Sequence, residues 1–168
     1  LEDDAQGHPV ARLFKPRKSI NHKQASLSAR QPTSWGSWQT AAWLGTRDIE
    51  QFLSFPGDDE NSSGAVIDLH RDFSGANIRL ARQLGTLEWS AGVELAQMRD
   101  RRKGFVNEQG VAGELKRDEL GQVQNRDLYS ALVWQPSDRW MLQLGGRYNT
   151  VSFDVADDFI QGSNPDDS

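Results

Sequence analysis

The sequence contains no cysteine. This absence excludes disulfide bonds, thiolate metal sites and cysteine nucleophiles together. It also leaves the redox compartment of the protein open, because there are no thiols whose pairing would indicate one. Any structural or chemical role must therefore rest on other side chains.

The sequence also lacks a long hydrophobic run. Hydrophobic residues make up 36% of the chain and the mean hydropathy is -0.69, so no stretch of about 20 apolar residues can be placed anywhere. This excludes a helical membrane protein, but not a membrane β-barrel, because lumen-facing residues dilute the hydropathy of each strand. The opening LEDDAQGHPV lacks the pattern of a secretion signal and predicts a mature or internal sequence.

Positive charge is scarce and dispersed. The formal net charge is -5, from 19 lysines and arginines against 24 aspartates and glutamates. Nucleic-acid binding needs a concentrated positive surface that neutralises phosphates. The sequence therefore predicts no nucleic-acid partner.

What the sequence does contain is a period of two, which is clear between residues 126 and 153. Two alternating runs flank a polar turn at residues 135–138, which predicts an antiparallel β-hairpin. One face of the second run carries Trp140, Leu142, Leu144, Gly146 and Tyr148. At about 3.3 Å per residue, Trp140 and Tyr148 lie about 26 Å apart. That nearly matches the roughly 25 Å apolar band between the aromatic girdles of a transmembrane barrel. A half-buried strand of a soluble sandwich also alternates, and it remains an alternative.

Further extended segments precede this hairpin. We expect strands within residues 17–30, 37–55 and 65–84, the last of which is joined by a turn at residues 83–86 to a strand at residues 87–96. That strand alternates Leu87, Trp89, Ala91, Val93 and Leu95 with Glu88, Ser90, Gly92, Glu94 and Ala96. The whole chain, residues 1–168, therefore predicts one all-β unit, an antiparallel up-and-down meander of about six strands.

The connections between these strands are expected to alternate in length. Residues 31–36, 83–86 and 135–138 predict short turns, whereas residues 56–64 and 98–127 and the acidic tail predict long polar connections. Alternate connections of a meander lie at the same end of the sheet. This arrangement is typical of an outer-membrane barrel, with short periplasmic turns and long extracellular loops.

Candidate catalytic and metal motifs are weak. His70-Arg71-Asp72 is similar to part of a kinase catalytic loop, but the glycine-rich loop and a suitably placed lysine are missing. Glu88 and Glu94 would lie about 20 Å apart, beyond the roughly 5 to 9.5 Å of a glycosidase pair. The histidines lack ligand spacing, and the tail acids lack the offsets of an EF-hand loop: Asp157, Asp158, Asp166 and Asp167. We predict no enzyme activity, no dedicated metal site and no cofactor.

Several segments closely resemble the barrel of TonB-dependent outer-membrane receptors. They are SWQTAAWLGTRDIEQFL, GAVIDLHRDFSGANIRLAR, MRDRRKGFVNEQG, RDLYSALVWQPSDRWMLQLGGRYNTVSFDVADDFI and NPDDS, and the likeness covers most of the chain from about Arg17. The resemblance implies a segment of a 22-stranded barrel in the outer membrane of a Gram-negative cell. Such a barrel is plugged by an N-terminal domain and takes up ferric siderophores or other scarce nutrients with energy delivered by TonB.

The resemblance also leaves parts of the receptor unmatched. The plug domain, the TonB box and the terminal aromatic strand have no counterpart in residues 1–168, so we expect transport and contact with TonB to depend on other parts of the receptor. An open sheet of about six strands has two unpaired edges, which need partners, covering or association.

Two groups of residues are candidates for function on this hypothesis. Four aromatic residues are expected to face lipid within the girdle: Trp89, Trp134, Trp140 and Tyr148. The longest predicted loop carries cations and an aromatic that would hold an anionic ferric chelate: Arg99, Arg101, Arg102, Lys103 and Phe105. Alternatively, these arginines pair with neighbouring acids such as Asp100 or with lipopolysaccharide phosphates. A different function, a soluble β-sandwich module that binds carbohydrate on a tryptophan platform, also remains open.

Overall fold

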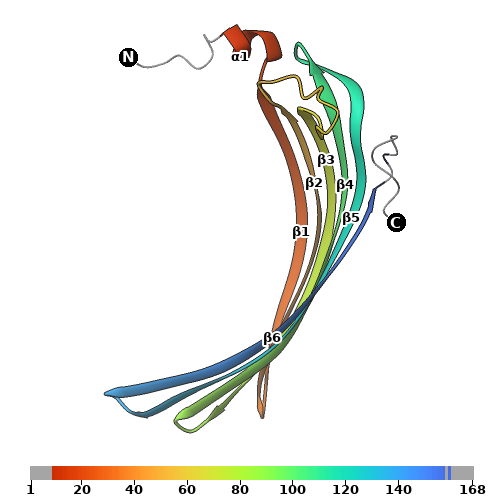
Figure 1. The fold of residues 1–168 in the computed structure, drawn as a ribbon. Coiled ribbons are helices and arrows are strands. Elements are labelled where there is room, and N and C mark those ends of the chain that lie inside the picture. The colour runs from red at the N-terminus through yellow and green to blue at the C-terminus, as the bar shows by residue number, and fades with distance from the viewer. Residues whose placement is uncertain (1–8, 158, 160–168) are drawn as a thin grey trace.

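The computed structural model describes residues 9–157 and residue 159. A short helix, α1 (Pro9–Phe14), precedes six strands: β1 (Arg17–Thr33), β2 (Gly36–Phe52), β3 (Val66–Leu84), β4 (Leu87–Glu108), β5 (Val111–Ser137) and β6 (Trp140–Asp157). The strands form one sheet in the order β1-β2-β3-β4-β5-β6, with every neighbouring pair antiparallel (Figure 1). The predicted all-β meander is confirmed. Within the acidic tail, Asp158, Asp166 and Asp167 lie outside the described residues.

The strands are long, and they curve and twist along their length (Figure 1). The longest, β5, has 27 residues, which at about 3.3 Å per residue extends over roughly 90 Å. The β1–β2, β3–β4 and β5–β6 turns lie together at one end, which we call the turn end. The connection between β2 and β3, the β4–β5 turn and α1 lie at the other end, the loop end.

Both predicted hairpins are confirmed by the strand register. Leu84 pairs with Leu87 across the β3–β4 turn. Leu128 pairs with Tyr148 and Trp134 with Leu142 in the β5–β6 hairpin. In these segments the alternation of apolar and polar residues was strong enough to fix the pairing, because a slip by one residue would exchange the two faces.

The prediction of a long loop over residues 98–127 is wrong. β4 continues to Glu108 and β5 begins at Val111, so the connection is a tight turn. Gln109 and Gly110 make this turn with φ angles of 55° and 92°. Here the strands carry charged residues on both faces, so they show no apolar periodicity although their backbones remain paired. The expected strict alternation of short and long connections is therefore wrong as well.

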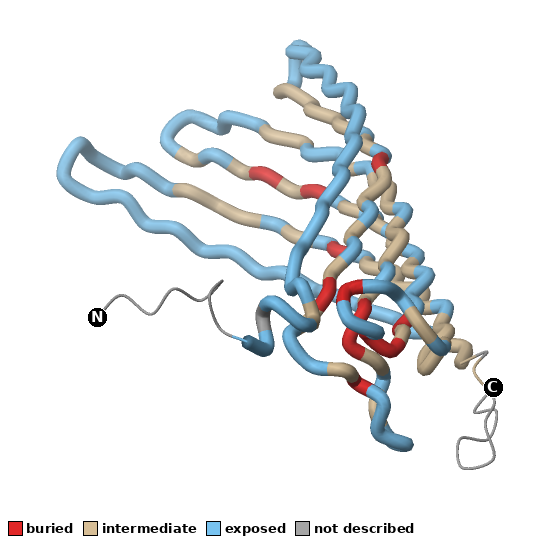
Figure 2. Tube along the Cα trace, turned by 90° about the horizontal axis from the view of Figure 1, so that it is seen from above, coloured by how far each residue is buried: buried red, intermediate tan, exposed pale blue. Residues whose placement is uncertain are grey.

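The loop end is held together around Asn107, whose side chain is only 1% exposed. Its Nδ2 donates to the carbonyl oxygens of Phe14 at 2.9 Å and Leu53 at 2.8 Å, and its Oδ1 accepts from the Gly110 amide at 2.7 Å. One side chain thus connects α1, the end of β2 and the β4–β5 turn. Much of the burial lies here, as Figure 2 shows, and it includes Phe52, Ala65, Val66 and Val106.

We expect Asn107→Ala to lower the free energy of unfolding by about 2 kcal/mol, because buried backbone groups at three sites lose their partner. A urea titration of the folded protein measures the effect. Asn77→Ala is the matched control, since Asn77 is only partly buried and no side-chain hydrogen bond is found for it among the described residues. An equal loss in both variants would contradict the role of Asn107.

Candidate functional site

The strand register divides the side chains between two faces. Residues directly opposite each other on neighbouring strands share a face. Ile78, Val93, Leu128 and Tyr148 are linked in this way. The predicted common face of Leu87, Trp89, Val93, Leu142 and Leu144 is therefore confirmed. We call it the apolar face. The opposite side, which includes Glu88 and Glu94, is the polar face.

Large aliphatic side chains are exposed on the apolar face, whereas a carboxylate is buried on the polar face. On the apolar face Leu44 is 63% exposed and Leu144 is 72% exposed, whereas Asp127 on the polar face is 2% exposed. The described residues form a single sheet with no second layer over either face. A difference in exposure then requires curvature, and the better covered polar face is the concave one.

An uncharged band crosses the apolar face on every strand. Its limit toward the loop end is the first charged residue of that face on each strand: Lys23, Asp48, Asp72, Arg99, Arg126 and Asp154. Between these residues and the turns, the apolar face of the strands carries one charged residue, Arg82, next to the β3–β4 turn. We call this region the apolar band. The polar face at the same level carries Arg79, Glu94 and Arg147.

The tryptophans of the apolar face gather at the turn end of the apolar band. All four predicted girdle residues lie on the apolar face: Trp89, Trp134, Trp140 and Tyr148. Trp38 joins them on β2, and Trp35 lies in the β1–β2 turn. The indole Nε1 of Trp89 donates to Ser130 Oγ at 3.0 Å. An aromatic with an apolar body and a satisfied polar group is suited to a boundary between apolar and aqueous surroundings.

Successive hairpins at the turn end are staggered. Ser37 pairs with Ala81, yet β2 begins one residue before Ser37 whereas β3 continues three residues past Ala81. Likewise, Leu87 is the first residue of β4, and β5 continues three residues beyond its partner Trp134. A progressive shift of register in one direction is what tilts the strands of a closed barrel.

The predicted ligand cluster lies on β4 and not on a loop, and its members are divided between the faces. Arg99, Arg101 and Lys103 are on the apolar face beyond the apolar band, and Arg102 is on the polar face. Phe105 pairs with Val66 at the loop end and shares the apolar face. Alternate residues of a strand point to opposite sides, so the sequence cluster does not form a single spatial group.

A hollow of about 360 Å³ on the polar face was not predicted. Its apolar lining comes from Trp43, Phe73, Met98 and Val123, and its polar lining includes His22, Arg47, Arg71 and Asn125. These residues come from β1 to β5, so no local motif contains them. The signal that could have indicated this hollow is the cross-strand pairing of aromatic residues with glycines. Trp43 lies against Gly75 and Phe73 against Gly45, where a Cβ atom would clash with the rings.

The charged side chains around this hollow differ in whether they have hydrogen-bond partners. Arg71 donates from Nε and Nη2 to the two carboxylate oxygens of Asp100 at 2.7 and 2.6 Å. The Nε atom of Arg47 is buried and has no hydrogen-bond partner within the described residues. The ring of His22 stacks on Phe73 with centroids 5.5 Å apart. A buried N–H without an acceptor is costly, so an anionic or carbonyl-bearing group entering the hollow would gain by accepting from Arg47.

A second charged group lies on the apolar face, beyond the apolar band. His70 Nδ1 is 2.5 Å from Asp48 Oδ1, and His70 Nε2 is 3.4 Å from Asp72 Oδ1. The hydrogen bond to Asp48 raises the pKa of His70 above its ordinary value of 6.5. His70 is therefore a cation over a wider pH range than an isolated imidazole.

The raised pKa of His70 predicts a pH-dependent stability. The contribution should be fully present below about pH 6.5 and should be lost as the pH rises through the higher folded-state value. We expect Asp48→Asn to lower the pKa of His70, which an NMR titration of the imidazole measures. Asp68→Asn is the control, because Asp68 lies on the same strand face as His70 and no contact between the two is found in the described chain. A His70 pKa that is the same in the wild type and in Asp48→Asn would refute the assignment.

No known family model matches the chain. In the described residues, no helix is long and apolar enough to cross a membrane.

Proposed function

We propose that the chain is a segment of an outer-membrane TonB-dependent receptor that takes up a ferric siderophore or a similar scarce nutrient. The apolar face would contact outer-membrane lipid and the polar face would line the interior. The observation that carries this proposal is the apolar band, where Leu44, Leu128 and Leu144 are more than half exposed, whereas Ser90 and Asp127 on the opposite face are buried. A transmembrane barrel has this inverted distribution, with alternation between a lipid face and a polar lumen.

The edges of the sheet support a larger barrel. Within the described residues, β1 and β6 each pair on one side only, so both present unpaired backbone groups. Backbone groups at membrane depth must be paired, and only closed barrels achieve this with strands. The hairpins are staggered in one direction, and the strands of a closed barrel are likewise staggered. Transport and contact with TonB would then belong to the assembled receptor, including its plug.

The hollow on the polar face is the best candidate for ligand contact. It offers aromatic surface from Trp43 and Phe73 together with the unpaired N–H of Arg47. Metal chelates with aromatic groups and negative charge are recognised by such combinations. Of the five predicted ligand residues, only Arg102 shares this face, and we retain it as a possible ligand contact nearer the loop end.

The alternative, a soluble β-sandwich that binds carbohydrate, has a different requirement. A sandwich packs a second sheet onto the apolar face, and the described residues contribute only one sheet. The row of Trp38, Trp89 and Trp134 would otherwise be a plausible sugar platform. Folding without detergent into a closed monomer would favour this alternative.

We expect Leu144→Arg in the full-length protein to lower the free energy of unfolding in lipid vesicles by about 2 to 4 kcal/mol, the cost of arginine near the middle of a lipid face. Gln143→Arg should cost far less, because Gln143 lies on the polar face. Leu144 is 72% exposed, so a soluble sheet would tolerate both changes equally. Equal unfolding free energies in lipid would therefore refute the assignment of the faces.

Uptake provides the test of ligand function. We expect the full-length receptor to import iron-55 supplied as hydroxamate, catecholate or citrate complexes, and Arg47→Gln to weaken binding of the imported complex by about tenfold through loss of a charge-assisted hydrogen bond. Leu128→Ala, on the apolar face, is the control. Import that is independent of TonB would contradict the proposal for the receptor. Equal affinity of the wild type and Arg47→Gln for the complex would contradict the proposal for the hollow.

A further inference from the structure

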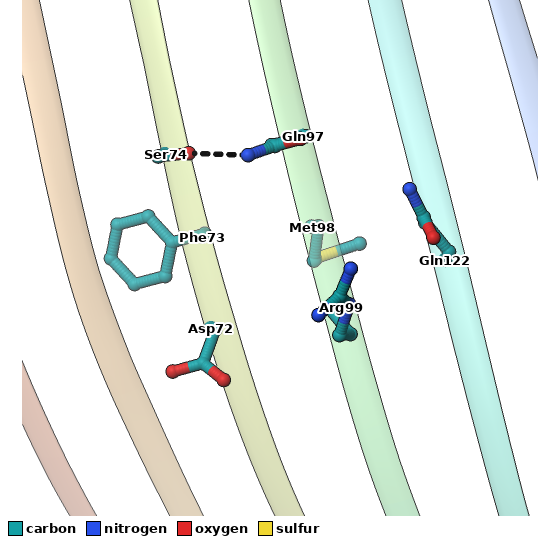
Figure 3. Close-up of a pocket in the computed structure, with 7 residues that line it drawn as sticks. All are labelled: Asp72, Phe73, Ser74, Gln97, Met98, Arg99 and Gln122. Atoms are coloured by element: carbon teal, nitrogen blue, oxygen red, sulfur yellow. Dashed lines mark hydrogen bonds between the residues drawn. The ribbon is translucent and has the colours of Figure 1, made fainter.

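A second, smaller hollow lies on the apolar face at the boundary of the apolar band. Its volume is about 140 Å³ and its lining includes Asp72, Ser74, Gln97, Arg99 and Gln122. Figure 3 shows that these side chains come from β3, β4 and β5, and that Gln97 Nε2 donates to Ser74 Oγ, at 3.1 Å. The hollow begins where Leu95, the last aliphatic side chain on the apolar face of β4, gives way to amide and charged groups.

Two arginines at this boundary have no partner among the described residues. In the described part of the chain, no ion pair or hydrogen bond is found for the side chains of Arg99 and Arg101. The neighbouring ionic groups are occupied, since Lys103 Nζ lies 3.2 Å from Asp118 Oδ2 and His70 contacts two carboxylates. Two successive side chains on this face of β4 thus carry positive charge without an ion pair to a described residue, directly beyond the apolar band.

We infer that Arg99 and Arg101 bind the phosphate of an anionic lipid headgroup whose acyl chains lie on the apolar band. The inference rests on the proposed function, because it requires the apolar band to be in contact with lipid. A guanidinium binds phosphate by charge-assisted hydrogen bonds. The side-chain amides of Gln97 and Gln122 add neutral donors beside Arg99.

The position of the arginines selects a lipid over a soluble ligand. They lie on the same face as Val93 and Leu95, opposite to the hollow on the polar face around Trp43 and Arg47. A phosphate that is covalently joined to acyl chains would engage the arginines and the apolar band together. Free phosphate would gain only the first of these interactions, so the structure favours an amphiphile.

One acidic group opposes this binding and provides an internal control. Asp72 lies directly across from Arg99 and lines the same hollow. Its carboxylate also contacts His70, so it remains near the site as a negative charge. The other acids of this face on β2 and β3 lie farther from Arg99 along the strands: Asp48, Glu50 and Asp68. Asp72→Asn should therefore strengthen the binding of an anionic headgroup.

The experiment uses the full-length protein carrying Leu95→Trp as a reporter beside Arg99, because Trp38, Trp89 and Trp134 lie at the turn end of the apolar band. The vesicles contain phosphatidylcholine mixed with phosphatidylglycerol, with one lipid at a time carrying brominated chains that quench tryptophan fluorescence. Quenching by each brominated lipid gives the ratio of the binding constants of the anionic and zwitterionic lipids. We expect the wild-type ratio to be above one. The ratio should fall by about fivefold in Arg99→Ala, and by about a further fivefold in Arg99→Ala/Arg101→Ala. Arg102→Ala is the matched control, because Arg102 is adjacent in sequence but on the polar face.

The outcomes separate this inference from the proposed function. Absence of quenching by either lipid would show that the apolar face does not contact lipid and would overturn both. Quenching with a ratio of one, or an equal fall in Arg102→Ala, would overturn the phosphate site alone. Displacement of phosphatidylglycerol by inorganic phosphate at similar concentration would show an ion site without lipid selectivity, and would likewise overturn the inference. An increased ratio in Asp72→Asn would support it.

Discussion

The structure depends on one constraint: a single sheet must satisfy its backbone internally and still find cover for an apolar face. Cross-strand pairing satisfies the backbone of β2 to β5 on both sides. It does nothing for Leu44, Leu128 or Leu144, which remain more than half exposed. Apolar surface of this extent is unfavourable in water. Lipid would offer cover without a second protein layer, so the proposed membrane location would meet this constraint.

The polar face meets the opposite requirement, since its charges lie in a concave surface. Asp127 is almost fully buried, and its carboxylate accepts from Arg147 Nε at 2.7 Å, Asn149 Nδ2 at 2.8 Å and Asn125 Nδ2 at 2.8 Å. A buried carboxylate is tolerated only when it is paired and hydrogen-bonded. This network connects β5 to β6 on the face opposite to Leu128 and Tyr148. The two faces therefore stabilise the same strands by different means.

The sequence predicted those parts of the fold in which one face is apolar. The hairpins around Trp89 and Leu142 were found because alternation of apolar and polar residues reports a strand with two different surroundings. Residues 98–127 were mistaken for a loop because both faces of the strand are polar there, so alternation carries no signal although pairing continues. The hollow around Trp43 and Arg47 was missed for another reason. It is assembled from five strands, and its position depends on register and curvature, which no local segment contains.

The change of surroundings along one strand is the basis of both proposed sites. On the apolar face β4 passes from Leu95 through Gln97 to Arg99 while its backbone pairing with β3 continues without a break. The strand thus extends beyond the apolar band as rigid paired structure, and Arg99 and Arg101 are held at a defined distance from the last aliphatic residue. A mobile loop would place cations near lipid only on average. Paired strands can align a phosphate site with one surface and a ligand hollow with the other, because alternate residues of the same strand serve both.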